Sequence, residues 1–438
     1  MNKRQVRKII EQEKISFILL QFSDFLGQPK NVVVDVERLD DVLENGLWFD
    51  GSSIEGFARI AESDMLLKPD LKTVATLPWT EDDRKTLRII CDVFKPSGRK
   101  LWADPRQILQ KVLAEANKIG FNYYVGAEFE FYLFERSALP ALKPHDYRSY
   151  FDYAPHSRAT TVCEKTMKAL RSFGIRGEMH HHEVGQGQHE IDIRYDQALK
   201  SADNILSLKM ALKAHSTNSE LKATWMPKPI VGFPGNGLHV HQSLWKDGKN
   251  LFFDPRNKYH LSRLAFQFLA GQLAHARALS AIVSPTVNSY KRLVSGYEAP
   301  VYVCWGQNNR SALIRIPRAS KNKASQSARL EYRAPDPSSS PYLTFAALLT
   351  AGLDGIKQKM TIPQSVEDNV YEFDFRKLEK NQIDLLPESL GEAIKALEKD
   401  KLLTDLLGPA KKRYLEIKKE EWRQFLSQVT QWEVERFL

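Results

Sequence analysis

The residues from Tyr123 to Phe134 form an apolar, aromatic run that carries two carboxylates, Glu128 and Glu130. Aromatic and β-branched residues at this density predict a β-strand. Because strand side chains alternate between two faces, we expect both carboxylates on one face and Phe129 on the other. Buried carboxylates this close together repel each other and need protons, paired cations or metal ions nearby. The run therefore predicts either a salt-bridged pair of core acids or a metal site.

A chain of 438 residues with 42% apolar residues is too long for one ordinary core and predicts two domains. The best linker is the polar segment 95–100, which contains proline and glycine. We therefore expect a small N-terminal domain at residues 1–100 and a larger domain at residues 101–438. Asp104 as a cap and Pro105 at the first position predict a helix directly after the linker.

The net charge of +9 raises the question of nucleic acid as a partner. Basic residues are mostly interleaved with acids, as in residues 416–423, which indicates a solvated surface and argues against nucleic-acid binding. The apolar stretch 15–22 is too short to span a bilayer, so no membrane partner is expected. Cys91, Cys163 and Cys304 lack metal or redox spacing and are expected to be buried thiols in a reducing cytoplasm.

Further ionisable residues lie on predicted strands or beside tight turns. Glu183 and Glu190 flank a Gly-Gln-Gly turn, which brings two carboxylates back toward one point. A glycine-rich turn then leads into a strand on which His239 and His241 share a face. The same period of two places Glu331 on a face with its neighbouring arginines.

Two other segments complete the pattern. Residues 261–282 predict one long helix, and residues 309–317 place two arginines, Arg310 and Arg315, in a strand-like setting. The chain beyond residue 341 is mostly helical and charged, which indicates packing and assembly more than chemistry.

The candidate ligands are five carboxylates and one imidazole: Glu128, Glu130, Glu183, Glu190, His239 and Glu331. With no thiolate among them, they favour Mg²⁺ or Mn²⁺ over structural zinc. The accompanying arginines are Arg292, Arg310, Arg315 and Arg333. Because arginine binds phosphate and carboxylate bidentately, metals with arginines suggest phosphoryl transfer. The sequence contains neither a P-loop nor a dinucleotide fingerprint.

Five motifs occur in one order along the chain: residues 50–57, 128–130, 226–229, 288–298 and 309–317. Together they resemble a type I glutamine synthetase of the alpha-like subtype, from near residue 15 to the C-terminus. The resemblance implies an α+β fold with a small β-grasp-like N-terminal domain. Its larger catalytic domain would hold a curved antiparallel sheet flanked by helices.

The resemblance also implies an activity. An enzyme of this kind ligates ammonium to L-glutamate with ATP as a substrate, through γ-glutamyl phosphate, in nitrogen assimilation. It implies two or more Mg²⁺ or Mn²⁺ ions per subunit. One ion would be held by Glu130, Glu183 and Glu190. The other would be held by Glu128, His239 and Glu331.

The remaining roles follow from the same resemblance. Glutamate would be bound by Arg292, Arg333 and the backbone of Gly235. The phosphoryl group would be stabilised by Arg310 and Arg315. The nucleotide would be bound by His241, Ser243, Arg329 and Arg315. Ammonium would meet Asp50, Ser53 and Tyr150, with Asp50 taking its proton. Glu298 would be the acid of a closing flap, and Arg59 would sense feedback by the product.

The resemblance further implies a homo-oligomer, a dodecamer of two hexameric rings in which Asp50 acts on the neighbouring subunit's site. A transcription regulator of nitrogen metabolism is a candidate partner. The adenylylation tyrosine of the beta subtype falls at Ile383, so that control is absent.

Several residues depart from the family pattern. Pro234 stands where an asparagine normally helps to hold glutamate, Ser295 replaces a proline, and Gly306 replaces a serine. The connection from Arg315 to Glu331 is also longer than the family's connection, by about three or four residues. These departures leave two alternatives open, a γ-glutamyl ligase that uses an organic amine and a non-catalytic regulatory relative.

Overall fold

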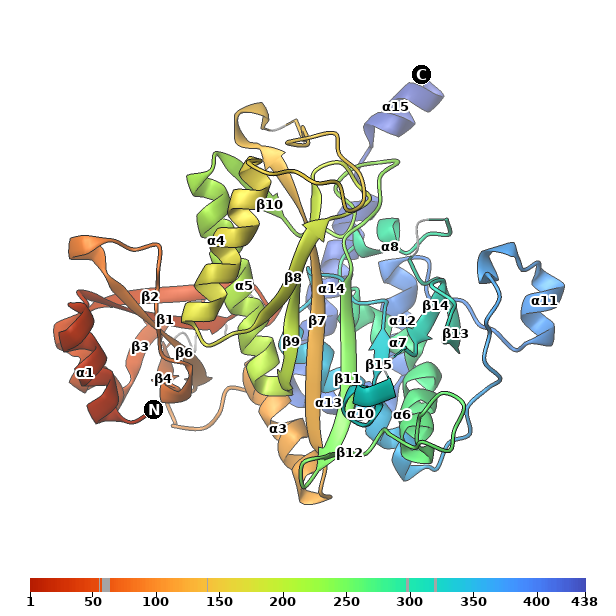
Figure 1. Cartoon of the computed structure of the whole chain (residues 1–438), viewed down its shortest axis with the longest axis horizontal. Helices are drawn as coiled ribbons and strands as arrows, with labels where there is room; N and C mark the ends of the chain where they lie inside the picture. The colour runs from red at the N-terminus through yellow and green to blue at the C-terminus, as the bar shows by residue number, and fades with distance from the viewer. Residues whose placement is uncertain (55, 57–63, 140, 297–298, 319–320) are drawn as a thin grey trace.

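Two β-sheets organise the chain. A computed structural model describes residues 1–54, 56, 64–139, 141–296, 299–318 and 321–438. The described residues form a six-stranded sheet in the N-terminal part and a nine-stranded sheet in the larger remainder. Figure 1 shows the two sheets in separate parts of the chain. This mixed architecture confirms the predicted α+β fold class. Within the described ranges, no helix is both long enough and apolar enough to cross a bilayer.

The smaller sheet has the strand order β2-β1-β6-β4-β3, and β5 pairs with β6. Its strands are β1 (Phe17–Ser23), β2 (Pro29–Asp35), β3 (Leu47–Asp50), β4 (Asp64–Pro69), β5 (Ala75–Thr76) and β6 (Thr86–Phe94). Its helices are α1 (Lys3–Glu13) and α2 (Leu39–Asn45). Gly46 adopts a φ of 78° after α2, which is the end that the Asn-Gly pair favours.

The larger sheet has the order β13-β14-β15-β11-β7-β9-β8, with β10 paired to β7 and β12 to β11. The strands are β7 (Asn122–Glu135), β8 (Gly177–His182), β9 (Gln188–Gln197), β10 (Leu221–Thr224), β11 (Leu238–Lys246), β12 (Lys249–Asn250), β13 (Tyr302–Gly306), β14 (Ala312–Arg315) and β15 (Leu330–Tyr332). All of these pairs are antiparallel except β13 with β14. The aromatic run is thus the strand β7, which lies between β11 and β9.

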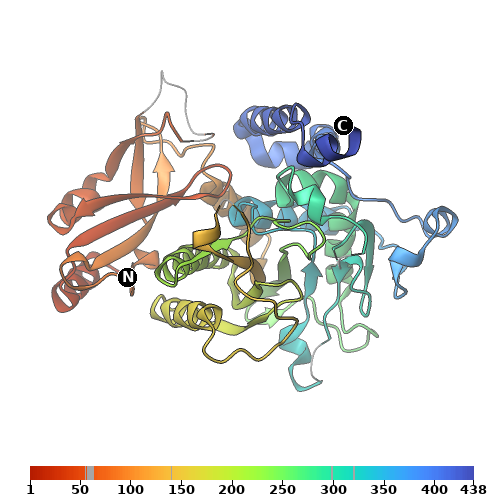
Figure 2. The same cartoon turned by 90° about the horizontal axis from the view of Figure 1, so that it is seen from above.

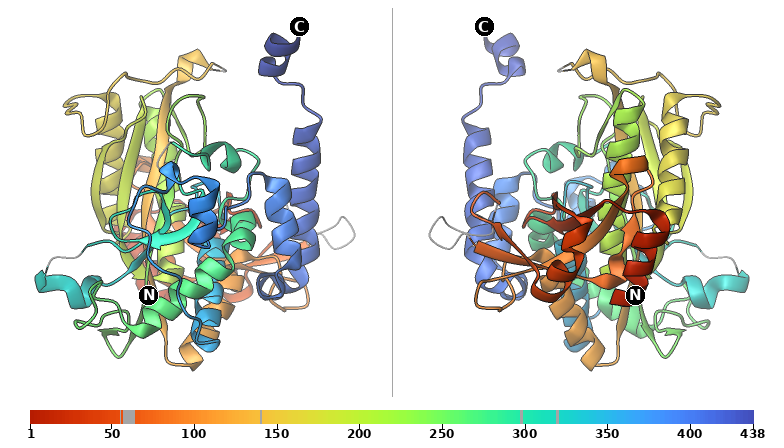
Figure 3. Two further views of the ribbon diagram at one scale, coloured as in Figure 1. Left: turned by 90° about the vertical axis from the view of Figure 1, so that its right-hand side faces the viewer. Right: turned by 90° about the vertical axis from the view of Figure 1, so that its left-hand side faces the viewer.

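The larger part of the chain also contains helices. They are α3 (Pro105–Lys118), α4 (Arg158–Ser172), α5 (Ala198–Asn218), α6 (Arg263–Ala274), α7 (Ala276–Val283), α8 (Ser289–Arg292), α9 (Ala324–Ser327), α10 (Pro341–Lys357), α11 (Phe375–Lys380), α12 (Leu390–Lys399), α13 (Lys401–Leu407), α14 (Lys411–Leu426) and α15 (Gln431–Phe437). In Figures 1 and 2, α4 and α5 lie on the side of the sheet nearer the N-terminal sheet. Figure 3 shows α15 standing apart from the other helices.

The predicted helix over residues 261–282 is wrong as a single element. The segment folds as α6 and α7, which are separated at His275 with φ −99° and ψ 6°. The His275 ring contacts two carboxylates, with Nδ1 2.6 Å from Asp400 Oδ2 and Nε2 3.4 Å from Asp354 Oδ2. These partners lie far away in the sequence, so helical periodicity could not reveal the interruption.

One large apolar core runs through both parts of the chain. Phe129 and Phe131 are fully buried on the back of β7, where Lys209 of α5 lies with Nζ 6.0 Å from the centre of the Phe129 ring. The three cysteines are buried free thiols, as the sequence predicted. Because α5 packs against the phenyl face, the carboxylates of β7 face away from this helix.

Arg106 links the N-terminal part to the helices of the larger part electrostatically. This α3 side chain is 2% exposed, and it contacts Asp70 after β4 at 2.8 Å and Asp92 on β6 at 2.6 Å. It also donates two hydrogen bonds of 3.0 Å to Asp203 on α5. Tyr342 of α10 donates a further hydrogen bond to Asp203. One guanidinium thus neutralises carboxylates from both parts of the chain.

We expect Arg106→Met to lower the free energy of unfolding by about 3–5 kcal/mol, because it leaves buried carboxylates without their cation. Urea denaturation followed by circular dichroism measures the change. The matched control is Arg7→Met, which removes a surface ion pair to Asp40 and should change stability by less than about 1 kcal/mol. Equal effects of the two substitutions would contradict the joining role of Arg106.

Candidate functional site

The front of β7 carries the first part of the site. Glu128 and Glu130 both approach His239 of β11, whose Nδ1 lies 2.8 Å from Glu128 Oε2 and whose Nε2 lies 3.9 Å from Glu130 Oε1. In the β11–β7 register His239 lies directly opposite Glu128. The two carboxylates therefore share one face, as alternation along the strand predicts.

Glu331 of β15 completes a first cluster with Glu128 and His239. One ligating atom from each of the three residues lies within 4.8 Å of the others. Glu331 is fully buried, and its Oε1 lies 3.7 Å from His239 Nδ1. Three neighbouring strands of the sheet thus bring together residues that are more than two hundred positions apart.

A second cluster lies across β7 from the first. Glu190 of β9 faces Glu130 in the β7–β9 register and faces His181 in the β8–β9 register. His181 Nε2 is 3.2 Å from Glu190 Oε1, and its Nδ1 is 3.4 Å from Glu183 Oε1. His181, Glu183 and Glu190 form a group with ligating atoms within 4.8 Å. Sequence reasoning missed His181, although a period of two counted back from Glu183 would have found it.

The two clusters differ in how their charge is balanced. Burial raises the pKa of Glu190 far above its usual range, and the nearby carboxylates of Glu130, Asp192 and Glu128 raise it further. Burial also raises the pKa of Glu128, but His241 and His239 outweigh this and hold that pKa well below its usual range. The second cluster therefore has unbalanced negative charge, which a hard divalent cation would neutralise.

Two arginines bind Glu331 directly. Arg315 Nε lies 2.7 Å from Glu331 Oε2, and Arg333 Nη1 lies 2.6 Å from Glu331 Oε1. Burial raises the pKa of Glu331, but Arg333 and then the two histidines lower it below the usual range. A third cation, Arg292, is buried and donates to the carbonyl oxygens of Ala334, Pro335 and Arg333.

Arg310 does not lie in a strand, contrary to the prediction. It is exposed in the turn that precedes β14, and only Arg315 of this pair lies on the strand. The parallel β13–β14 pairing begins at Ala312, so the backbone before it is free to turn.

The glycine-rich turn before β11 fits closely against the site. The backbone N–H of Gly237 donates to Glu130 Oε2 at 2.7 Å. A Cβ at Gly237 would lie 2.7 Å from Arg292 Nη2, and one at Gly235 would lie 2.4 Å from the carbonyl oxygen of Pro227. A side chain at Gly235 would clash with backbone, and one at Gly237 would displace Arg292 or His239, so the turn brings backbone close to these residues and to the carboxylates.

A pocket of about 420 Å³ opens beside Glu128. Its lining includes His241, Ser243 and Arg329. The resemblance assigns these three residues, and also Arg315, to nucleotide binding. Arg329 Nε donates to His241 Nδ1 at 3.2 Å, so His241 Nε2 carries the proton that faces Glu128 at 2.7 Å. The long connection before β15 also lines the pocket, through Lys323 and residues of α9.

The structure shows the contacts made at the positions that depart from the family pattern. The Pro234 carbonyl accepts a hydrogen bond of 2.7 Å from Tyr132. A Cβ at Gly306 would lie 2.4 Å from the carbonyl oxygen of Val366, so the local backbone has no room for the usual serine. The connection to β15 is tied down by Asn250 of β12, which donates to the carbonyl oxygen of Ala328 at 2.8 Å.

Some predicted residues lie away from the two clusters. Asp50 is at the end of β3, where its carboxylate accepts from Ser52 N–H, and Ser53 is exposed in the same turn. Tyr150 lies near the second cluster, with its ring centre 5.7 Å from that of His181. Arg59 and Glu298 fall outside the residues that the structure describes.

Comparison with known proteins identifies related chains over the full length. Residues 14–96 match the family "Glutamine synthetase, beta-Grasp domain", and residues 102–437 match "Glutamine synthetase, catalytic domain". A glutamine synthetase from Methanocaldococcus jannaschii is 45% identical, with 100% of this chain and 98% of that protein covered. One from Thermotoga maritima is also 45% identical, with coverages of 99% and 98%.

Solved structures are similar over the same length. The structure described as the GmaS/ADP complex has a TM-score of 0.89 and 33% identity, with 98% of both chains covered. Plasmodium falciparum glutamine synthetase has a TM-score of 0.87 and 26% identity, with 100% of this chain and 99% of that chain covered.

We expect Glu190→Gln to stabilise the metal-free protein while weakening Mn²⁺ binding by about tenfold or more. The substitution removes one of several repelling carboxylates, but it also removes charge that a cation needs. Thermal unfolding with and without Mn²⁺ measures both effects. Glu164→Gln, at an exposed position of α4, is the control. Unchanged Mn²⁺ affinity in Glu190→Gln would remove this residue from the metal ligands.

Proposed function

The chain belongs to the glutamine synthetase family, and we propose that it is the glutamate–ammonia ligase of its cell. In this reaction ATP, L-glutamate and ammonium give L-glutamine, ADP and phosphate through γ-glutamyl phosphate. The observation that carries the proposal is the pair of carboxylate clusters on one sheet face, with Arg315 and Arg333 at Glu331 and a pocket beside Glu128. Relatives named glutamine synthetase at 45% identity over the whole chain support it.

The donor atoms of both clusters fit Mg²⁺ or Mn²⁺. Oxygen ligands predominate, and the excess carboxylate charge of the second cluster is unbalanced without a cation. One ion would be held by Glu128, His239 and Glu331, and a second by Glu130, Glu183 and Glu190, with His181 close enough to join them. Bound cations supply positive charge that offsets the charge of the transferring phosphoryl group.

The chain's own cations act on the substrates. In the proposal Arg310 and Arg315 stabilise the phosphoryl group in transfer, while Arg333, Arg292 and the Gly235 backbone orient glutamate. Nucleotide binding falls to His241, Ser243 and Arg329, because they line the pocket beside Glu128. A relative solved with ADP supports nucleotide binding by this fold. Phosphorylation turns the carboxylate oxygen of glutamate into a good leaving group, so ammonia can displace phosphate.

Ammonium capture is assigned to Asp50, with Ser53 and Tyr150. The Ser52 backbone N–H lowers the pKa of Asp50, so its carboxylate stays ionised near neutral pH and can attract ammonium. Asp50 lies on the N-terminal sheet, so we propose that it serves the site of a neighbouring subunit. Glu298 would then close the site against water, and Arg59 would sense the product.

We further propose a dodecamer of two hexameric rings. Exposed apolar residues gather at the C-terminal helix, where Trp432 is 65% exposed and Phe437 is 76% exposed. Such a surface suits burial against another subunit. Within the type I family the chain fits the alpha-like subtype, because the buried Ile383 offers no hydroxyl for adenylylation. A transcription regulator of nitrogen metabolism is a proposed partner of the ring.

We also propose a cytoplasmic location and a domain boundary near residue 100. The buried free cysteines suit a reducing cytoplasm. The division into residues 1–100 and 101–438 agrees with family matches that end at residue 96 and begin at residue 102.

Pro234 leaves open a second candidate function, a γ-glutamyl ligase that uses an organic amine, while the retained Asp50 and Ser53 argue against it. Proline has no side-chain amide to hold glutamate, so the amino-acid end of the site is altered here. The retained acids and arginines support catalysis by either candidate enzyme. The experiment must therefore identify the nucleophile, which is ammonium in one case and an organic amine in the other.

We expect phosphate release from Mg-ATP and glutamate to depend on ammonium, with glutamine as the product. Release only in the presence of an amine such as methylamine would establish the γ-glutamyl ligase, and release in neither series would favour a non-catalytic relative. Pro234→Asn is expected to lower the glutamate KM by a factor of about 2–10, the worth of one regained hydrogen bond. Ala274→Ser, in a solvent-facing pocket on α6, serves as the control.

Subunit sharing predicts complementation. Asp50→Ala and Glu190→Gln should each be inactive alone, since each removes one part of every site. After the two variants are dissociated and reassembled together, roughly a quarter of the sites should hold both intact parts and recover activity. Size-exclusion chromatography checks that rings reform. No recovered activity in reassembled mixed rings would show that Asp50 acts within its own subunit.

A further inference from the structure

A third group of potential ligands lies behind the second cluster. In the β8–β9 register His182 pairs with His189, one position along from the pair formed by His181 and Glu190. Side chains of neighbouring residues point to opposite faces of a strand. The ring of His189 accordingly packs near Phe131, on the buried face of β7, with a centre-to-centre distance of 6.0 Å. This group is therefore separate from both carboxylate clusters.

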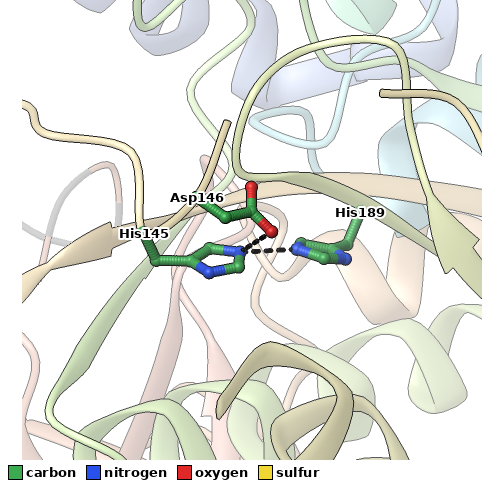
Figure 4. A group of neighbouring side chains, drawn as sticks. All are labelled: His145, Asp146 and His189. Carbon is green, nitrogen blue, oxygen red and sulfur yellow. Dashed lines mark hydrogen bonds and ion pairs between the residues drawn. The ribbon is translucent and has the colours of Figure 1, made fainter. Parts of the chain in front are cut away.

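The remaining members come from the segment between β7 and α4. His145 Nε2 lies 2.8 Å from His189 Nε2 and 3.5 Å from Asp146 Oδ2. Figure 4 shows the two rings and the carboxylate directed toward one another. One ligating atom from each of the three residues lies within 4.8 Å of the others. Two imidazole nitrogens and one carboxylate oxygen thus converge on a single point.

The described residues satisfy only part of the hydrogen-bonding capacity of this group. Oδ2 of Asp146 is buried and accepts no hydrogen bond from the described residues. A buried carboxylate oxygen without a donor is unfavourable, and such atoms in native proteins commonly mark a missing ligand. The two facing Nε2 atoms, 2.8 Å apart, share one proton when no metal is bound, and both can ligate a cation once that proton is lost.

The other oxygen of Asp146 is held firmly. Oδ1 accepts from the backbone N–H of Gly187 at 3.0 Å and lies 3.1 Å from His182 Nε2. His182 Nδ1 faces the carbonyl oxygen of Glu183 at 2.6 Å, which fixes the orientation of its ring. An outer shell that orients a carboxylate with one oxygen free is typical of metal sites.

We propose that His145, Asp146 and His189 bind one zinc ion. Two imidazoles and one carboxylate suit Zn²⁺, whereas Mg²⁺ prefers oxygen ligands alone. Neighbouring ligands of a tetrahedral zinc ion lie about 3.3 Å apart. The two separations from His145, 2.8 and 3.5 Å, lie close to this value, and the third lies within 4.8 Å. Water would take the fourth position.

This zinc ion is structural. The segment that carries His145 and Asp146 also contains Tyr150, whose ring lies beside His181 of the second cluster. The backbone N–H of Phe151 donates to the carbonyl oxygen of His182 at 3.1 Å, which ties the same segment to β8. Zinc would fix this segment against β9 and thereby hold Tyr150 at the edge of the active site.

The test uses the full-length protein in millimolar Mg²⁺, which occupies the carboxylate clusters. After removal of bound metal by a chelator, the protein is given one equivalent of Co²⁺ or Zn²⁺ per chain. We expect one tightly held ion per chain, intense visible absorption bands of tetrahedral Co²⁺, and a higher midpoint of thermal unfolding with zinc. His145→Gln and Asp146→Asn should lose the bands and the thermal shift. His260→Gln, at an exposed histidine, should keep both.

Unchanged cobalt bands in both His145→Gln and Asp146→Asn would overturn the proposal, as would a wild-type protein that binds no zinc in Mg²⁺. Circular dichroism shows whether the variants are folded. If they are not, anomalous diffraction at the zinc edge from wild-type crystals decides the question. A peak between His145 and His189 supports the site, and its absence there overturns it.

Discussion

The structure depends on holding several carboxylates close together on one face of one sheet. Each buried acid without a partner would destabilise the fold by several kcal/mol, so the face must be surrounded by cations. Strand alternation makes the arrangement possible, because the residue between Glu128 and Glu130 is a phenylalanine that anchors the strand in the core. The rigid sheet register then fixes which acid meets which histidine or arginine.

The two clusters solve the charge problem differently. Around Glu331 the protein supplies its own cations, Arg315 and Arg333, in direct contact. Around Glu190 the described residues supply one ion-pair partner, His181, and burial together with the neighbouring carboxylates raises the pKa of Glu190. A metal ion bound at the second cluster would therefore contribute more to stability. A metal ion at Glu331 would instead displace arginine contacts and free these guanidinium groups to meet a phosphate or a carboxylate.

The sequence predicts features that depend on residues close together in the chain, and it does not predict contacts between distant segments. The strand β7 and the shared face of its acids come from local alternation, and the helix after Asp104 comes from a local cap. Arg106, the interruption at His275 and the group around His145 depend on partners from distant segments. Neither periodicity nor spacing encodes such pairs. The roles of the ligands and arginines rest on family resemblance together with the geometry described above.

The departures from the family pattern avoid the strands that carry the acids. Pro234 precedes β11 and presents its carbonyl to Tyr132, and the long connection before β15 lines the pocket beside Glu128. Both are loops, where a change in sequence alters neither strand register nor the contacts of Glu331. Substrate preference can therefore change at the glutamate end or the nucleotide end while the carboxylates stay in place. Because the acids lie on strands and the departures lie in loops, the intact acids support catalysis but do not show whether ammonium or an organic amine is the nucleophile.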